Sequence, residues 1–272
     1  MTNLFRTHQL FLTLMFSASA YAFSEEKDNE EWQMYDDFLA LGVVSVPEYE
    51  GSGDQQIVPL LFGQITFAGN RYLAIQGTGA QLNVLNSKEW AVGPSVNFGF
   101  GRDDGVDNEV IALLEEVDTA IELGGFISRT WQGVGHPSGS LSASFNFVQD
   151  VADAHDGWQA QANIGYGRSF GKKLRLQTNL GVTFVDDSFS DTYFSVTSMD
   201  SSASGLQTYE AEGGVKDYGV NAIATYRLSE RWSAVGFVSY RRLVGDAVDS
   251  PIVDQEGDEN QVILAFGFGY SF

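Results

Sequence analysis

The sequence predicts an antiparallel β-barrel that spans a membrane. Three observations support this fold class: the pattern of the last strand, a leader-like N-terminus, and many segments with a period of two. In the last eleven residues, VILAFGFGYSF, one face is large and apolar and the other mostly small. The large face consists of Val262, Leu264, Phe266, Phe268, Tyr270 and Phe272. In a soluble sandwich this strand would be an unpaired edge strand prone to aggregation. In a membrane barrel, lipid covers the large face and the first strand pairs with the edge.

The N-terminus has the three parts of an export signal. Arg6 and His8 give a weakly basic start, Leu10 to Phe16 is a short apolar run, and Ser17 to Ala22 ends in an A-x-A arrangement. We therefore expect residues 1–22 to be a Sec-type signal peptide that is cleaved on export. The apolar run is too short to cross a bilayer, and no later segment approaches 18 consecutive apolar residues, which excludes a helical membrane protein.

Composition narrows the class further. The 272 residues include no cysteine, which excludes disulfides and thiolate metal sites. The formal net charge of −21 becomes −22 without the signal peptide, because Arg6 is the one charged residue in that segment. A chain this acidic is not expected to bind nucleic acid. The 30 glycines and 20 phenylalanines suit a barrel, in which only alternate residues face lipid.

Residues 23–37 (FSEEKDNEEWQMYDD) are acidic and lack periodicity, so we expect a periplasmic N-terminal tail followed by a barrel over residues 38–272. Alternation in the barrel region predicts twelve strands, good to a few residues at each end. They are 38–46, 57–68, 71–85, 88–102, 117–132, 138–149, 156–170, 172–186, 191–198, 215–228, 231–244 and 259–272.

The strand count has one alternative. With twelve strands and both termini in the periplasm, the tight hairpin at 170–173 faces outside and the longer loop 103–116 faces the periplasm. This reverses the usual arrangement of short periplasmic turns and long outer loops. Omitting 38–46 and 191–198 gives ten strands and restores that arrangement for most loops.

The two faces of the predicted strands differ as a barrel requires. Large residues such as Ile164 and Leu180 alternate with polar or small ones such as Asn163 and Asn179. We expect the apolar series to face lipid and the polar series to line a wet lumen. The lumen series is Gln159, Gln161, Asn163, Arg175, Gln177, Asn179 and Arg227.

The sequence offers little for catalysis. His136 precedes a proline in a predicted turn, and His155 follows Asp150 and Asp153 and precedes Asp156 in another. A histidine beside carboxylates can act as a base, but we expect His155 to be a solvated turn residue. No His-Glu-x-x-His motif occurs, and the Gly-x-Ser-x-Gly string at 167–171 (GRSFG) lies at the end of a predicted strand and its tight hairpin, whereas a nucleophile elbow needs a strand-to-helix turn. We therefore predict no enzyme activity and no catalytic residues.

Two acidic loops, RDDGVDNE and DQEGDEN, carry hard oxygen ligands that suit Ca²⁺ or Mg²⁺. Their carboxylates are Asp103, Asp104, Asp107 and Glu109 in the first loop, and Asp254, Glu256, Asp258 and Glu259 in the second. Neither loop matches the twelve-residue calcium loop, so we interpret both as hydrated loops and predict no metal and no cofactor. The alternative is weak divalent bridging to lipopolysaccharide phosphates.

Four segments resemble the MipA/OmpV family of outer-membrane proteins, the MltA-interacting protein and its relatives. They are PEYEGSGDQQIVPL at 47–60, VGPSVNFGFGR at 92–102, EVDTAIELGGF at 116–126, and RRLVGDAVDSPIVDQEGDENQ at 241–261. The resemblance implies an outer-membrane barrel. Some members are described as scaffolds that join a lytic transglycosylase to a murein synthase, and others are linked to osmotic response, adhesion or small-molecule uptake, so the family alone does not fix an activity.

The favoured hypothesis is an outer-membrane scaffold in a Gram-negative bacterium, in contact with lipids and lipopolysaccharide. Its implied partners are a lytic transglycosylase and a murein synthase. The alternative is a small-solute channel or a surface binding or adhesion barrel, which rests on the polar lumen series. A barrel enzyme is the least favoured hypothesis. We also expect the acidic segment Gly245–Asn260 to be dispensable for folding, because it supplies no lipid-facing strand.

Overall fold

The computed structural model describes residues 37–272 of the chain. The predicted signal peptide and all of the predicted tail except Asp37 lie outside the described residues.

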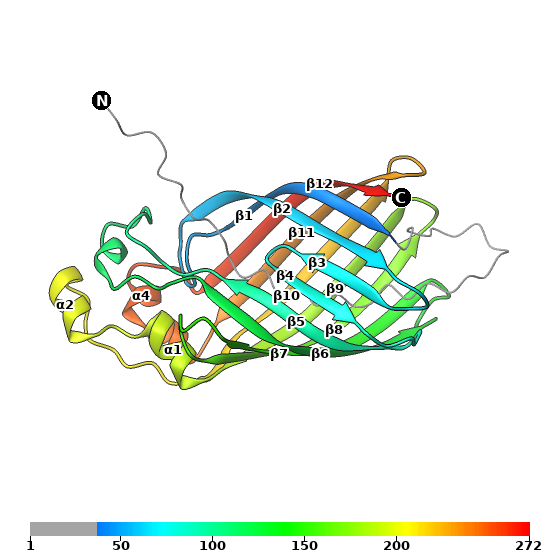
Figure 1. The fold of residues 1–272 in the computed structure, drawn as a ribbon. Helices are drawn as coiled ribbons and strands as arrows, with labels where there is room; N and C mark the ends of the chain where they lie inside the picture. The colour runs from blue at the N-terminus through cyan, green and yellow to red at the C-terminus, as the bar shows by residue number, and fades with distance from the viewer. Residues whose placement is uncertain (1–36) are drawn as a thin grey trace, which may run out of the picture.

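Twelve antiparallel strands form a closed barrel in which each strand pairs with its neighbours in sequence (Figure 1). They are β1 (Phe38–Pro47), β2 (Gln55–Thr66), β3 (Tyr72–Gln76), β4 (Gly79–Asn83), β5 (Trp90–Gly99), β6 (Ala120–Gln132), β7 (Gly139–Asp150), β8 (Trp158–Phe170), β9 (Leu174–Val185), β10 (Gly214–Arg227), β11 (Trp232–Leu243) and β12 (Asn260–Ser271). The first and last strands close the barrel, with Phe38 opposite Ser271. The barrel fold is therefore confirmed.

The helices gather beyond one end of the barrel, the end away from the C-terminus (Figure 1). They are a short 3₁₀ helix η1 (Ile111–Leu113), α1 (Asp187–Phe194), α2 (Ser198–Ser204), α3 (Asp246–Asp249) and α4 (Pro251–Asp254). None of the helices within residues 37–272 is long and apolar enough to cross a membrane.

The count of twelve is confirmed, but two of the predicted strands are wrong. The predicted strand 71–85 is a hairpin of two short strands, β3 and β4, that turns at Gly77, whose φ of +61° suits a glycine. The predicted strand 191–198 instead holds the end of α1, an isolated β-bridge at Val196 and the start of α2. Asp186 caps α1 by accepting a hydrogen bond from the Phe189 N–H, and a capping box of Thr197 and Asp200 starts α2.

These corrections resolve the question of orientation. The connections at the end that holds the termini are all short: 67–71, 84–89, 133–138, 171–173 and 228–231. Those at the far end include the three longest: 48–54, 100–119, 151–157, 186–213 and 244–259. By the usual arrangement of such barrels the termini are periplasmic, and we name the two ends the periplasmic end and the outer end. The ten-strand alternative is wrong, because residues 38–47 form β1, which pairs with both β2 and β12.

The faces of the strands follow the predicted alternation. In β12 the side chain of Phe266 is 53% exposed on the outside, whereas that of Ile263 is 3% exposed inside. The predicted lumen series lies on the inward face, and Gln159, Asn163, Gln177 and Asn179 are buried there. Polar side chains join neighbouring strands across this surface, for example Asn179 Nδ2, which donates to Asn221 Oδ1 at 2.8 Å.

The lumen wall has an apolar sector as well as the predicted polar one. The apolar sector is the cluster of Val44, Val46, Val58 and Ile263, with Leu60, Phe100, Phe237 and Ala265 packed against it. Its inward residues come mainly from β1, β2, β11 and β12, whereas the polar series comes mainly from β5 to β9. The inner surface is therefore two-sided, and the sequence analysis recognised the polar side alone.

Candidate functional site

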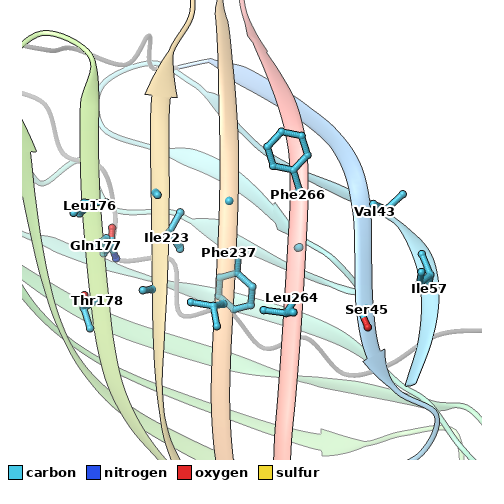
Figure 2. Close-up of a pocket in the computed structure, with 15 residues that line it drawn as sticks. Val43, Ser45, Ile57, Leu176, Gln177, Thr178, Ile223, Phe237, Leu264 and Phe266 are labelled. Carbon is cyan, nitrogen blue, oxygen red and sulfur yellow. The ribbon is translucent and has the colours of Figure 1, made fainter. Parts of the chain in front are cut away.

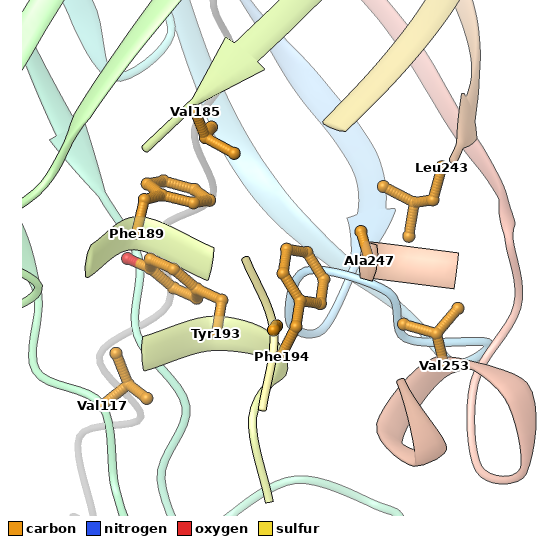
Figure 3. Packing of buried hydrophobic residues seen from close by; sticks show 9 residues of the cluster. Val117, Val185, Phe189, Tyr193, Phe194, Leu243, Ala247 and Val253 are labelled. Atoms are coloured by element: carbon orange, nitrogen blue, oxygen red, sulfur yellow. The ribbon is translucent and has the colours of Figure 1, made fainter. Parts of the chain in front are cut away.

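The long outer loops pack into a folded layer over the outer end, which we call the cap. Its main hydrophobic core joins α1, α3 and α4 to the outer ends of β9 and β11, and Figure 3 shows these side chains converging. The core consists of Val117, Val185, Phe189, Tyr193, Phe194, Ala211, Leu243, Ala247 and Val253. A second cluster ties η1 to the other loops and consists of Tyr49, Ile111, Leu114, Val196, Leu206 and Ile252. Burial of this much apolar surface stabilises the loops in one arrangement.

The segment Gly245–Asn260 is part of this cap, and the expectation that the barrel folds without it stays a prediction. This segment contains α3 and α4, which contribute Ala247, Ile252 and Val253 to the two cores. The Ser250 hydroxyl also donates to the Phe194 carbonyl at 2.5 Å and accepts from the Ile252 N–H at 3.2 Å. Deleting the segment would remove part of the cap.

Beneath the cap, one buried polar group is centred on Glu122, which points inward from β6. Its side chain and that of His155 are fully buried. Gln159 Nε2 donates to Glu122 Oε1 at 2.5 Å, and Asn97 Nδ2 donates to Glu122 Oε2. His155 Nε2 lies 3.4 Å from Glu122 Oε1. The four residues come from three strands and one outer loop, so this group, which we call the Glu122 group, joins the cap to the wall.

The prediction that His155 is a solvated turn residue is wrong. Asp150, which we had interpreted as a loop carboxylate, folds the 151–157 connection around itself by accepting from the N–H groups of Ala152, Ala154, His155 and Asp156. Asp153 and Asp156 have positive φ values of 58° and 54°, which tighten this loop. The result is a compact turn that presents the imidazole to the lumen.

A second buried group is ionic, and we call it the Lys216 group. Lys216 Nζ lies 2.9 Å from Glu50 Oε1 and 3.7 Å from Asp217 Oδ2. Arg241 pairs with the same two carboxylates, at 4.0 and 3.5 Å. Burial alone would raise the pKa of Glu50, but the two cations together outweigh it and hold that pKa below its usual value. Since Glu50 follows β1 and Lys216 lies in β10, the group links separated parts of the barrel mouth.

Helix α1 lies between these two groups. The ring of Phe189 is 5.0 Å from the His155 ring and 5.0 Å from Lys216 Nζ, which lies over its face. Tyr193 packs on both rings, at 4.5 Å from Phe189 and 5.7 Å from His155. Burial raises the pKa of the Tyr193 hydroxyl above its usual value, and the nearby carboxylate of Glu122 adds to the shift. The aromatic layer therefore separates the two polar groups and keeps Tyr193 neutral.

The geometry around His155 is that of a structural residue. Nδ1 accepts a hydrogen bond from the Gly157 N–H at 3.1 Å, so the ring proton of a neutral imidazole lies on Nε2 and faces Glu122. A general base needs a free nitrogen within reach of a nucleophile. Both nitrogens of His155 instead face groups of the protein itself. His136, the other described histidine, lies in the 133–138 turn, where Nδ1 contacts the Ser138 hydroxyl at 2.8 Å.

The two acidic loops meet at the outer surface of the cap. Asn108 Nδ2 donates to Glu256 Oε2 at 3.0 Å, and the Asp107 N–H donates to Glu48 Oε2 at 2.9 Å. Asp103 Oδ1 accepts from the Gly105 N–H, and Asp258 Oδ1 accepts from the Asn260 N–H. Within residues 37–272 no group of three or more histidine or carboxylate side chains is arranged to hold a metal ion.

The lipid-facing wall carries a furrow of about 470 Å³ across β9 to β12, β1 and β2 (Figure 2). Most of its lining belongs to two cross-strand rows of outward residues. One row runs Leu176, Ala224, Gly236, Phe266 and Val43, and the other runs Thr178, Ala222, Val238, Leu264, Ser45 and Ile57. The small residues Ala222, Ala224 and Gly236 form the depression, and a Cβ added at Gly236 would meet no atom within 4 Å.

The sequence analysis missed both buried groups and the furrow. Lys216 and Glu50 are 166 residues apart, so no local pattern links them. One signal was present: Glu122, Asp217 and Arg241 occupy positions that alternate with lipid-facing residues, which places charges on the inward face. Ionisable side chains on that face of a barrel strand are costly unless paired and therefore predict partners.

Fold and site together define a class: a transmembrane barrel whose outer end carries a folded cap with paired buried charges. A family model described as MltA-interacting protein MipA matches residues 39–272, and the chain belongs to this family. The resemblance identified in the sequence is confirmed.

Individual relatives agree with this membership. The putative outer membrane protein YiaT of Escherichia coli K12 is 31% identical over 117 residues, which is 43% of this chain and 46% of YiaT. The MltA-interacting protein of the same strain is 27% identical over 99 residues, 36% of this chain and 38% of that protein. Each alignment thus spans less than half of the curated relative. Among solved structures, the NanC porin superposes with a TM-score of 0.46 at 8% identity, over 86% of this chain and 100% of that chain. The protein is a barrel of the outer membrane.

Proposed function

We propose that this barrel acts by recognition, as a scaffold that holds murein-cleaving and murein-synthesising enzymes at the periplasmic side of the outer membrane. The observation that carries the proposal is the family match over residues 39–272, together with a relative named for its interaction with MltA. On this proposal the partners are a lytic transglycosylase and a murein synthase, and the protein needs no cofactor.

The cap supports a role in recognition. The ionisable groups beneath it are engaged with one another: Glu122 accepts from Asn97 and Gln159, and Lys216 pairs with Glu50. A catalytic site instead needs a nucleophile and a base poised toward a substrate. Side chains that hold loops over one mouth of the barrel leave the other end as the surface that faces the periplasm.

The docking surface would be the periplasmic end. It consists of short turns, among them the basic turn 171–173 (GKK) and the mixed-charge turn 228–231 (LSER). The acidic segment Glu25–Glu31 precedes β1 in the sequence and carries five carboxylates and one lysine. Opposite charges on a partner would speed association and fix its orientation.

Capture of murein enzymes from cells tests the proposal. Chains lacking Glu25–Glu31, or carrying Lys172→Glu and Lys173→Glu, should retain a heat-modifiable barrel and capture less lytic transglycosylase than the unaltered protein. The matched control is Asp103→Asn with Asp104→Asn, which removes two charges at the outer end and should leave capture unchanged. Equal capture by all of these chains, or by none including the unaltered protein, would rule out docking at the periplasmic end.

A small-solute channel or binding barrel is the second candidate. The observation that favours it is the polar inner wall, where Arg175 Nη2 donates to the Ser140 hydroxyl at 3.1 Å and Ser95 donates to Asn146 at 2.9 Å. A barrel of twelve strands has a lumen narrow enough for side chains to obstruct, so polarity alone does not produce conduction. Conductance across planar bilayers separates the two candidates.

A further inference from the structure

The hydrogen-bonded wall of the barrel is interrupted between β2 and β5. β3 pairs with β2 only over Phe62–Thr66, and β4 pairs with β5 only over Ser95–Asn97. A strand that spans the membrane needs about 9–11 residues, whereas β3 and β4 have five each. Figure 1 shows these two strands as the shortest arrows in the wall. Within residues 37–272, no strand lies outward of their turn between the outer half of β2, residues 55–60, and the outer end of β5.

The edge of β2 is adapted to this interruption. The Leu61 carbonyl accepts from the Gly77 N–H at 3.0 Å, so alternation directs the backbone groups of Pro59 and Ile57 to the unpaired side. Unpaired N–H groups are costly inside a membrane. Proline has none, and Pro59 stands in the middle of this edge, which explains a proline inside a barrel strand.

The outer edge of β5 is short. The Phe98 N–H donates to the Thr78 carbonyl at 3.2 Å at the hairpin turn, so β5 extends past the hairpin only by Gly99. At the hairpin turn the two outer edges are separated by the hairpin itself. Three inter-strand spacings of about 4.8 Å place them about 14 Å apart there, which is enough for a hydrocarbon chain to enter.

Apolar surfaces lie on both sides of this interruption. On the inside is the apolar sector of the lumen, to which β2 contributes Val58 and Leu60. On the outside, the furrow of Figure 2 ends at Ile57, whose side chain is 73% exposed. A path along β2 from the furrow to the lumen therefore passes from Ile57 to Val58 without crossing a polar residue.

One aromatic side chain closes this path. Phe100 directly follows β5, yet it packs against the apolar cluster formed by Val44, Val46, Val58 and Ile263. The side chain therefore lies against this inner apolar cluster at the β5 side of the interruption.

We propose that the interruption between β2 and β5 is a lateral portal, through which an acyl chain of a surrounding membrane lipid enters the apolar sector of the lumen. Phe100 is the side chain that closes it. The furrow on the outer wall is the approach along which the acyl chain lies. This property is additional to scaffolding and does not depend on it.

The chain has no cysteine, so single-cysteine variants can report on lipid access. Leu60→Cys and Val235→Cys place a bimane label on half-buried inward positions in one cross-strand row, which runs from Leu60 through Gly42 and Gly267 to Val235. Leu60 lies beside the interruption, whereas Val235 lies in β11, which is paired on both sides. Leu61→Cys, on the lipid face, is the positive control. The labelled barrels are reconstituted in phosphatidylcholine vesicles with or without brominated acyl chains, which quench the label on contact.

We expect strong quenching at Leu61, at least half as much at Leu60, and none at Val235. The additional change Phe100→Ala should raise quenching at Leu60 at least twofold and leave Val235 unchanged. Equal quenching at Leu60 and Val235, with or without Phe100, would overturn the portal. If the Leu60 variant does not show heat-modifiable migration, Val58→Cys replaces it and Val235→Cys stays the control, with the same expected and overturning results.

Discussion

The two ends of this barrel are held by different physical means. At the periplasmic end the strands are joined by tight turns, in which Gly133, Gly135 and Gly171 supply the positive φ values. At the outer end, helices and loops share two hydrophobic cores and pair four buried charges. Turns depend on a few local residues, whereas the cap depends on partners far apart in sequence. The outer end should therefore respond sharply to the loss of one partner.

The largest effect is expected from Glu50→Ala. Removing this carboxylate leaves Lys216 buried beside Asp217 alone, and breaking such a pair costs about 3–5 kcal/mol. The cap should open, and its loops should become sensitive to protease added to intact cells, while the barrel keeps its heat-modifiable migration.

The matched control for that change is Glu259→Ala. The pair of Arg242 and Glu259, at 2.7 Å, is exposed to solvent on both sides, so its loss should change stability very little. Equal protease sensitivity in the two variants would show that the Lys216 group does not hold the cap.

A second comparison concerns the wall between the two ends. Leu180→Arg places a charge on the lipid face, where Leu180 is 62% exposed, and should destabilise the folded barrel by about 2–4 kcal/mol. Gln161→Arg, on the inward face of β8, should cost much less. Denaturant unfolding of both variants in lipid vesicles measures the difference, and a similar loss at both positions would mean that the assigned facing is wrong.

Acid should loosen the outer end before the wall. The pKa of Glu50 is lowered in the fold, so its contribution to stability is complete above its unfolded value of 4.5 and is lost as the pH falls through the lower, folded value. Asp200 acts with the same sign, because hydrogen bonds from Thr197 and the Glu115 N–H outweigh the effect of burial and lower its pKa. Pepsin should therefore cut the cap loops only well below pH 4.5. Cleavage that is independent of pH would contradict this account.

Apart from the control variants, the smallest effect is expected from Ser250→Ala. The hydroxyl caps α4 through the Ile252 N–H and also satisfies the Phe194 carbonyl. Losing a helix cap of this kind costs about 1 kcal/mol. Hydrogen exchange of α4 amides should rise modestly while amides of β12 stay protected, and uniform exchange across both would contradict a local role.

Much of the barrel could be predicted from the sequence, because the period of two in strands such as β8, β9 and β12 reflects a local choice between lipid and lumen. The hairpin of β3 and β4 was missed because the alternation continues from Tyr72 to Asn83 on both sides of Gly77. The two short strands therefore look like one long strand. Residues 191–198 hold the end of α1 and the start of α2. They were mistaken for a strand because Asp186, the residue that caps α1, lies before this range.

The cap and its buried groups could not be predicted in the same way. His155 sits in a stretch that looks hydrated, and its burial depends on α1, more than thirty residues further on. The pairing of Glu50 with Lys216 likewise depends on closure of the barrel, which brings β1 and β10 to the same mouth. Such contacts form only when the chain has folded. The local sequence shows that these residues are charged, but it does not show which residues they pair with.

Single-channel recording in planar bilayers tests most directly the claim that the cap holds the outer end shut and that the protein acts by recognition. The account predicts no steady open-channel steps for the unaltered protein, and steps that emerge in the Glu50→Ala variant when the cap opens. Steady, long-lived steps from the unaltered protein, equal in size to those of the variant, would contradict it and favour the channel.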